Sequence, residues 1–265
     1  MKKARSEILL EKYCPTIYCF TKETKTDWEL LDSNFENNYL KVGEPVESNI
    51  MGILLHAEAG DEFLKAFLGY CESLASSLEQ YAVEKKNFRD IIVGKFTNLV
   101  GLNYLNPIGE LSVLKKLIEK NYELVRIEDN ETFPDAKPKD FLFKSPAGKN
   151  ILIEVLNIHL KNSYQTTGEL KTFLFKKIKT KVQAETKGIT PMSEENILFF
   201  QPVLWHVDLI NYRKHLAFFS TFKRTSGSEI GLHFNILGFC TFGTINKKDF
   251  VFGELTTFYD NFTIE

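Results

Sequence analysis

The sequence predicts an α/β protein, with a mixed central sheet flanked by helices and a mainly helical extension at its N-terminus. Two observations support this fold class. Apolar residues recur at helical spacing between about 50 and 81. From 107 onward, helical and strand patterns alternate, and two neighbouring strand patterns near the centre form a hairpin. We therefore expect a helical extension over 1–105 that packs on an α/β core over 106–265.

Composition narrows the class of protein. The chain has 265 residues, 43% of them hydrophobic, and a formal net charge of −2, so affinity for nucleic acid requires a local basic patch. There is no apolar run of about 18 residues, and the first residues, MKKARSEILLEKYCP, make a poor signal peptide. We expect a cytoplasmic protein with no membrane partner. Cys14 and Cys19 have no second close pair, so we expect free thiols rather than a zinc site.

The extension contains three predicted elements and no recognisable chemistry. TIYCF (16–20) is interpreted as a short strand. One long helix is expected from Ile50 to Tyr81, because its apolar residues follow helical spacing, and a second helix is expected over 87–105.

The core elements follow in order. A helix over 107–120 begins with Pro107, which suits a first helical turn, and YELVRI (122–127) is a strand. The remaining elements are a hairpin over 139–157, a helix over 168–185, a strand over 196–207, a helix over 209–220 and two C-terminal strands. Thr166 and Glu169 match a capping box for the helix over 168–185, and Asp208 caps the helix over 209–220. Pro202 predicts an edge or a bulge in its strand.

Two carboxylates lie on the predicted hairpin. Side chains alternate along a strand, so Asp140 shares a face with Leu142, and Glu154 shares a face with Leu152. A four-residue turn at SPAG (145–148) places Asp140 roughly opposite Glu154. Like charges on neighbouring strands repel each other, but a divalent cation that prefers carboxylate oxygens makes the pair favourable.

A third carboxylate lies on the helix before the hairpin. Glu110 falls on the same face as Val113, Leu114, Leu117 and Ile118, at the start of the apolar stripe. Burying an unpaired carboxylate is costly, although a helix N-terminus reduces that cost. Glu110 would therefore be a third acidic group directed toward the sheet.

At these residues the sequence resembles the PD-(D/E)XK superfamily of restriction-endonuclease-like nucleases. The resemblance covers about 107–160, more loosely to 207, and depends on three segments: GELSVLKKL (109–117), KDFLF (139–143) and IEVLN (153–157). It implies a restriction-endonuclease-like core and Mg²⁺- or Mn²⁺-dependent cleavage of DNA, in restriction or phage defence. By the same resemblance, Asp140, Glu154 and the carbonyl of Val155 would bind the metal, and Glu110 would be an outer or direct ligand.

One position departs from the family pattern. The family lysine, which positions the attacking water and stabilises charge on the phosphate, would stand at Leu156. Lys177 or Lys181 on the following helix could supply the missing ammonium, because both border its apolar stripe. Asn157 could substitute in part, although strand alternation directs it to the other face. Alternatively, the site is degenerate and the protein does not cut.

The helix after the hairpin is basic. Seven lysines and two glutamates lie between 161 and 187. Lys171, Lys176 and Lys179 are candidates for contacts with DNA phosphates. A solvated helix face is an equally good interpretation, and the absence of arginine from this helix disfavours bidentate phosphate recognition.

The sequence leaves further interpretations open. The carboxylates could be structural, with Asp140 at an exposed strand start, Glu154 paired with a lysine such as Lys144, and Glu110 a helix-start charge. A catalytically inactive nuclease fold that binds nucleic acid or a protein partner is the main functional alternative, and an unrelated α/β protein is another. His159 and His206 end two strands, where a structural role is favoured. Whether the protein forms a homodimer is left open by the sequence.

Overall fold

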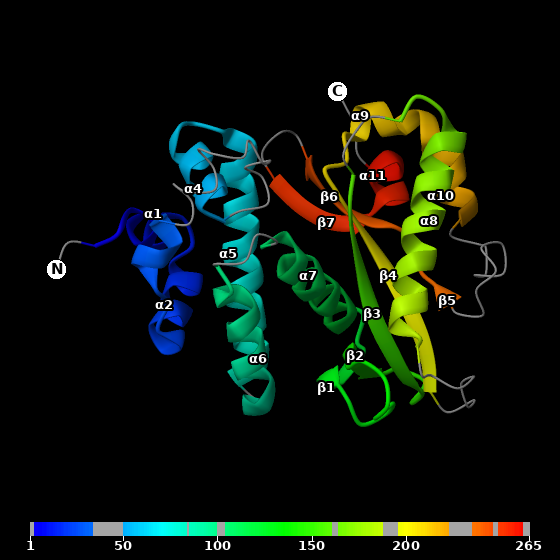
Figure 1. Ribbon diagram of the computed structural model, residues 1–265, viewed down its shortest axis with the longest axis horizontal. Helices are drawn as coiled ribbons and strands as arrows, with labels where there is room; N and C mark the ends of the chain where they lie inside the picture. The colour runs from blue at the N-terminus through cyan, green and yellow to red at the C-terminus, as the bar shows by residue number, and fades with distance from the viewer. Residues whose placement is uncertain are drawn as a thin grey trace. The chain divides into compact units, whose positions relative to one another are not determined.

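The computed structural model describes residues 3–33, 50–83, 85–99, 104–160, 164–187, 196–222, 235–245 and 249–261. The chain divides into two compact units (Figure 1). The first comprises Met1–Lys115 with Thr244–Phe250, and the second comprises Lys116–Gly243 with Val251–Glu265. The second unit contains most of a mixed sheet with helices packed against it, so the expected α/β class with a helical N-terminal part is confirmed. The boundary predicted at 105/106 stays a prediction.

The first unit is built from helices in its described N-terminal part. They are α1 (Arg5–Tyr13), α2 (Pro15–Thr24), α4 (Ile50–Glu58), α5 (Glu62–Val83), α6 (Lys86–Thr97) and most of α7 (Leu105–Glu119). The strand expected at 16–20 is wrong, because these residues lie within α2, which has Pro15 at its first position. The single long helix expected from Ile50 is also wrong. It breaks into α4 and α5 near Gly60, whose φ of 105° is outside the helical range.

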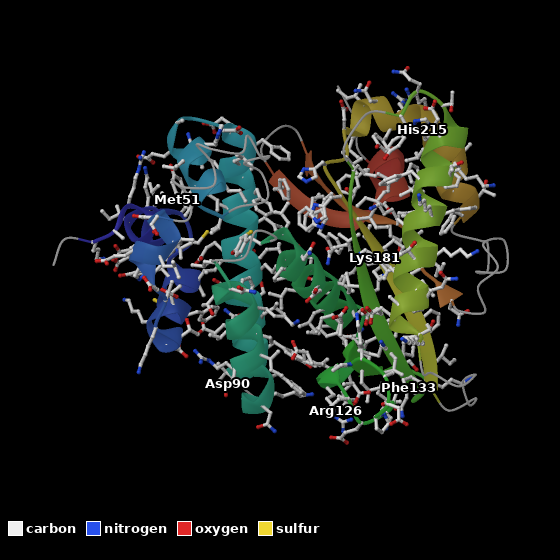
Figure 2. The ribbon with its side chains drawn as sticks, in the orientation of Figure 1. Met51, Asp90, Arg126, Phe133, Lys181 and His215 are labelled. Atoms are coloured by element: carbon white, nitrogen blue, oxygen red, sulfur yellow. The ribbon has the colours of Figure 1, made fainter. Side chains whose placement is uncertain are left out.

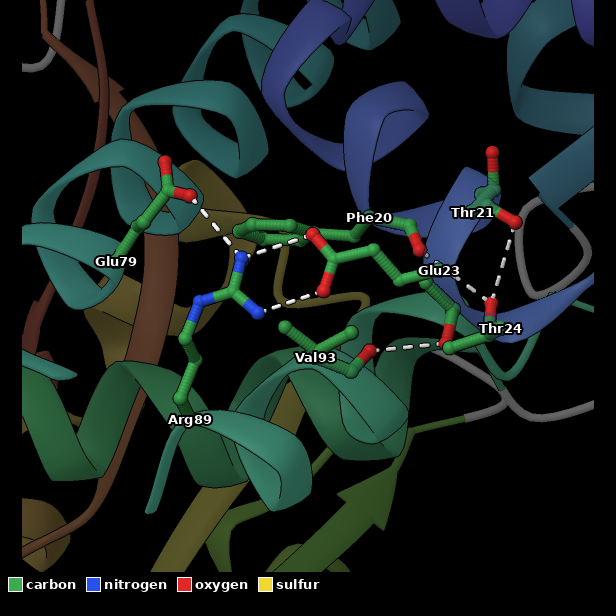
Figure 3. A network of polar contacts seen from close by, with 8 residues as sticks. Phe20, Thr21, Glu23, Thr24, Glu79, Arg89 and Val93 are labelled. Atoms are coloured by element: carbon green, nitrogen blue, oxygen red, sulfur yellow. Dashed lines mark hydrogen bonds and ion pairs between the residues drawn. The ribbon is translucent and has the colours of Figure 1, made fainter. Parts of the chain in front are cut away.

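A guanidinium joins three helices of this unit. Arg89 of α6 donates two hydrogen bonds, of 2.6 and 2.8 Å, to the two carboxylate oxygens of Glu23 on α2. Its Nη2 also lies 3.5 Å from Glu79 Oε1 on α5 (Figure 3). Paired hydrogen bonds between arginine and a carboxylate are geometrically specific, so Arg89 fixes the packing of α2, α5 and α6.

Replacing Arg89 by methionine should destabilise the first unit by about 1 kcal/mol, since the variant keeps the side-chain stem and removes the bidentate pair. Urea unfolding followed by circular dichroism measures the difference. Lys65→Met is the matched control, because the Lys65–Glu62 pair is more exposed and lies within one helix, so its loss should change stability less. Equal stabilities of the two variants would contradict a linking role for Arg89.

The sheet has the order β1-β2-β3-β4-β6-β7, with β5 also paired to β4. Its strands are β1 (Glu123–Asp129), β2 (Lys139–Lys144), β3 (Asn150–His159), β4 (Asn196–Trp205), β5 (Asn235–Ile236), β6 (Cys240–Ile245) and β7 (Asp249–Glu254). The pairs β1–β2 and β2–β3 are antiparallel, whereas β4 runs parallel to β3, β5 and β6. The connection from β3 to β4 includes a helix, as parallel neighbours require.

The hairpin register differs from the sequence-based prediction by one residue. Lys144 pairs with Asn150, so the connection is 145–149, five residues rather than the four of SPAG. Ser145 N–H donates to the carbonyl of Lys149, and Gly148 takes a φ of 79° that favours glycine. The longer turn sets Phe141 opposite Ile153, and the register continued by one position sets Asp140 opposite Glu154.

The expectation that Pro202 marks a sheet edge is wrong. β4 has β3 on one side and both β5 and β6 on the other. Pro202 lies between the residues that pair with β5 and those that pair with β6, where the ladder on that side is interrupted. A residue without an N–H group is tolerated at such an interruption. The Gln201 side chain donates from Nε2 to the carbonyls of Pro202 and Gly238 there, at 3.0 and 2.7 Å.

Helix α8 (Thr167–Glu185) covers one face of this sheet (Figure 1). Its capping box is confirmed, because the Thr166 hydroxyl accepts from Glu169 N–H and the Glu169 carboxylate accepts from Thr166 N–H. The helix buries an apolar stripe against the side chains of β3 and β4 that point to the same face. The stripe consists of Leu170, Leu174, Ile178 and Val182.

The C-terminal elements complete this core. Asp208 caps α9 (Leu209–Tyr212) as expected, and α9 continues through a 3₁₀ turn (Arg213–His215) into α10 (Leu216–Phe222). The second predicted C-terminal strand, DFVFGELTTFY (249–259), is too long, because DFVFGE forms β7 and the following residues form α11 (Leu255–Asn261). Within the described residues, no helix combines the length and the apolar character that crossing a bilayer requires.

Candidate functional site

The Asp140 and Glu154 side chains are on neighbouring strands and face the side of the sheet that α8 covers. Leu142 and Leu152, which alternate with them, belong to the hydrophobic cluster beneath α8. Asp140 is half-buried, whereas Glu154 is only 9% exposed. Asp140 Oδ2 accepts a hydrogen bond of 2.7 Å from the Val155 amide. This bond ties the start of β2 to the middle of β3 and orients the Asp140 carboxylate.

Lys181 is the lysine of α8 that reaches this pair of carboxylates. It follows Ile178 by one turn, at the border of the buried stripe of α8, and is labelled in Figure 2. Burial lowers the pKa of Lys181, and the charges of Glu154, Glu185 and Asp140 oppose that shift. The ammonium is therefore within electrostatic reach of both hairpin carboxylates.

The C-terminal end of α8 is anchored to the segment that enters β2. Lys139 is 1% exposed, and its Nζ donates to the Glu185 carbonyl at 2.9 Å and to Glu185 Oε2 at 3.2 Å. Lys137 Nζ donates to Glu185 Oε1 at 2.9 Å. Cations are stabilised at a helix C-terminus, so both lysines favour this position of the helix. This anchor fixes the C-terminal end of α8, the helix that carries Lys181.

Leu156, where the sequence resemblance would place a lysine, has an apolar side chain. It is 1% exposed and belongs to the hydrophobic cluster beneath α8. Residue 156 therefore contributes to the core, and the α8 lysine that interacts electrostatically with Glu154 is Lys181. Asn157 does not replace it, because its Oδ1 accepts a 2.9 Å hydrogen bond from Trp205 Nε1.

The other predicted lysines of α8 face solvent. Lys177 lies one turn before Lys181 and is exposed, with its ammonium 5.7 Å from the centre of the Phe173 ring. The three candidates for phosphate contacts, Lys171, Lys176 and Lys179, are also exposed. All three are accessible, and the Lys171 ammonium lies 5.1 Å from the centre of the Phe175 ring.

Glu110 lies on α7 in the first unit. Lys95 Nζ on α6 donates to Glu110 Oε2 at 2.9 Å, and both side chains are largely buried. The Glu110 carboxylate is thus largely buried, as the sequence predicted, and its charge is paired with the Lys95 ammonium. A role for Glu110 beside Asp140 and Glu154 stays a prediction.

A cluster of rings lies where β3 and β4 end, and the sequence did not single it out as a unit. His159 Nδ1 lies 3.4 Å from His206 Nε2. The His159 ring stacks on Trp205, with 6.1 Å between centroids and 10° between planes, and Trp205 stacks in turn on Phe242. The two histidines are 47 residues apart, so only the parallel register of β3 and β4, which pairs His159 with Trp205, could have predicted their meeting.

The titration of His159 should make the protein less stable in mild acid. Burial, then His206 and Lys181, lowers the pKa of His159 from 6.5 to about 4. Between these values the unfolded chain binds more protons than the folded one, so stability falls as pH falls from about 6.5 to about 4. Discounted for the partial exposure of the ring, the loss is about 2 kcal/mol.

Urea unfolding at several pH values through that window measures this effect. His159→Phe retains a ring that can stack on Trp205 but does not titrate, so its stability should depend less on pH than that of the wild type. The same pH dependence in both proteins would contradict the low pKa.

The donor atoms near Asp140 suit a hard divalent cation. Carboxylate oxygens are what Mg²⁺ prefers, and a carboxylate that accepts one amide hydrogen bond retains lone pairs for a cation. Within the described ranges, no group of three or more His, Cys, Asp or Glu side chains is arranged to hold a metal. Mg²⁺ commonly uses one or two carboxylates together with waters and substrate phosphates, so two carboxylates fit this ion.

Comparisons of the chain with protein-family models, with curated proteins and with solved structures gave no match. A function must therefore be inferred from the order of the core elements and from the geometry around Asp140, Glu154 and Lys181.

Proposed function

We propose that this protein is a metal-dependent endonuclease that hydrolyses phosphodiester bonds in DNA, built on a restriction-endonuclease-like core. The observation that carries the proposal is the convergence of Asp140, Glu154 and Lys181 on one face of the sheet. The order α7, β1, β2, β3, α8, β4 supports it, because it matches the helix, hairpin and helix that the sequence resemblance implies.

The residues that would hold Mg²⁺ or Mn²⁺ are Asp140, Glu154 and the carbonyl of Val155. When bound, such an ion polarises a phosphoryl oxygen and lowers the pKa of a bound water. The amide of Val155 already donates to Asp140. In an extended strand, the amide and carbonyl of one residue point to the same side, so the Val155 carbonyl is directed toward β2 as well.

Lys181 would take the role of the motif lysine in the family that the sequence resembles, which is to position the attacking water and stabilise charge on the phosphate. Its ammonium can stabilise negative charge that develops on a phosphate, and can orient a water beside it. Partial burial strengthens this interaction, because charges act over a lower effective dielectric away from bulk water. The pair of Lys139 and Glu185 fixes the end of α8, so Lys181 is held in place before a substrate binds.

The substrate would be DNA, with the lysines of α8 following its phosphates. Lys171, Lys176 and Lys179 are exposed, and each phosphate contact should contribute about 0.9 to the dependence of log affinity on log salt. Restriction or phage defence is the biological role that we propose for such an enzyme.

Incubation of the purified protein with supercoiled plasmid and Mg²⁺ or Mn²⁺ tests the proposal. We expect nicking or linearisation that stops with a chelator and is lost in both Asp140→Ala and Glu154→Ala. Lys144→Ala is the matched control, because Lys144 lies on the same hairpin, is exposed and pairs with Asn150 at the turn. Cleavage that survives both acidic substitutions would sink the proposed site.

A second candidate function is a catalytically inactive nuclease fold that binds nucleic acid or a protein partner. The burial of Leu156 in the core favours it, because the motif position is committed to packing. Salt-dependent DNA binding without cleavage in Mg²⁺, Mn²⁺ or Co²⁺ would select this candidate over the enzyme.

A further inference from the structure

We propose that His159 and His206 form a binding site for a Zn²⁺ ion at the end of β3 and β4. The distance of 3.4 Å between His159 Nδ1 and His206 Nε2 carries the inference. Nitrogens bound to zinc lie about 2.0–2.1 Å from the ion, and two of them in a tetrahedral arrangement are about 3.3–3.4 Å apart. The two nitrogens lie at the long end of the hydrogen-bond range, and the same separation suits two nitrogen ligands of one ion.

The His159 imidazole is held in position by its neighbours. It stacks on Trp205, which is itself fixed by the hydrogen bond from its Nε1 to Asn157 and by stacking on Phe242 at 4.3 Å between centroids. Support of this kind around a histidine orients its nitrogen toward the ion before the ion binds. Burial also keeps His159 in the neutral form, which is the form that binds a metal.

The backbone of His206 is in a conformation that few residues adopt. His206 follows the last residue of β4 and has a φ of 62°, in the left-handed region. Such a conformation costs free energy in a residue other than glycine, and it persists where the surrounding structure requires it. Here it places an exposed imidazole opposite the fixed ring of His159, with 5.5 Å between their centroids.

The chemistry of the site selects a borderline transition-metal ion. Two neutral imidazoles suit Zn²⁺ and its neighbours in the first transition row, in contrast to the carboxylates of the hairpin, which suit Mg²⁺. Within the part of the chain that the structure describes, no third His, Cys, Asp or Glu completes a group of three ligands. The pair lies at the carboxyl ends of two parallel strands, where α/β sheets commonly bind ligands, and water or an external ligand can take further positions on the ion.

Titration of the full chain with Zn²⁺ in a calorimeter tests the site. Every protein would carry Cys19→Ser, so that the exposed thiol does not compete for the ion. We expect one Zn²⁺ per chain, with an affinity that falls by at least about tenfold in His206→Asn, because loss of a ligand should exceed the effect of losing a residue that only supports one. Asparagine tolerates a positive φ, so this variant should fold.

Two control variants show whether Zn²⁺ binding depends on this pair of histidines. His56→Ala removes an exposed histidine of the first unit and should bind Zn²⁺ as the parent does. Asp140→Ala removes a carboxylate of the proposed nuclease site and should also retain the histidine-dependent binding, whether or not the protein cuts DNA. Equal affinity in His206→Asn and the parent, or absence of Zn²⁺ binding by the parent, would overturn the proposal. Substitution of Co²⁺ for Zn²⁺ should give the visible absorption of a tetrahedral ion in the parent and in both controls, and not in His206→Asn.

Discussion

For the proposed nuclease activity, Lys181→Met should reduce the rate of DNA cleavage by about 10²- to 10⁴-fold, while Lys177→Met should change it by less than about threefold. Both lysines border the apolar stripe of α8, one turn apart, and both are candidates from sequence alone. The structure distinguishes them, because Lys181 is partly buried and feels the charges of Glu154 and Asp140, whereas Lys177 is exposed beside Phe173. Methionine preserves the unbranched stem, so the comparison isolates the ammonium.

The measurement is the initial rate of plasmid nicking at saturating Mg²⁺, together with the affinity of each variant for uncleaved DNA in Ca²⁺. A lysine that acts on the reacting phosphate should affect the rate far more than the affinity. Thermal unfolding of both variants shows whether α8 remains docked. If Lys177→Met lost the rate and Lys181→Met retained it, the assignment of the ammonium would be reversed.

The elements of the core could be predicted from sequence because their signals are local. The capping box at Thr166 and Glu169 marks the start of α8, and the spacing of Leu170, Leu174, Ile178 and Val182 marks its buried face. The N-terminal errors have a local cause as well. TIYCF is rich in β-branched and aromatic residues, which favour strands, but packing within a helical unit overrides that preference.

The candidate site could be predicted only in part. The facing of Asp140 and Glu154 follows from strand alternation and the hairpin, so it was accessible to sequence reasoning. The anchor formed by Lys139 and Glu185 was not, because its residues lie 46 positions apart and no periodic pattern links them. The meeting of His159 and His206 likewise depends on the parallel register of β3 and β4, which a strand pattern does not specify.

Leu156→Lys, which introduces the lysine that the sequence resemblance would place there, should destabilise the protein by about 4 kcal/mol and should not increase the proposed cleavage. Leu156 is 1% exposed and packs among the apolar side chains beneath α8. The substitution removes a buried leucine, which alone is worth about 2–5 kcal/mol, and introduces an ammonium that must be desolvated. The flexible lysine stem recovers some of the packing, so the expected loss of stability is smaller than the sum of the two costs.

The introduced ammonium would also lie beneath α8, the helix whose Lys181 ammonium already interacts with Asp140 and Glu154. Two ammonium groups at one site repel each other, and burial disfavours the charged form, so the pKa of the introduced lysine should fall. A lysine whose folded pKa is depressed binds fewer protons in the folded chain than in the unfolded one, so the loss of stability is full below the folded pKa and shrinks as pH rises from there toward about 10. Leu156→Met, which keeps the volume and polarity of the site, should cost less than about 1.5 kcal/mol at every pH.

Urea unfolding of Leu156→Lys and Leu156→Met at neutral and alkaline pH measures both effects. The double variant Leu156→Lys with Lys181→Met adds the decisive comparison. We expect Lys181 on α8 to supply the ammonium of the proposed site, because residue 156 on β3 is buried in the core. An ammonium at residue 156 should then not restore the cleavage that Lys181→Met removes. Recovery of cleavage in the double variant would show instead that the sheet position still reaches the reacting phosphate. In that case, an ammonium at either residue 156 or residue 181 could serve the proposed reaction, and the position on α8 would not be required.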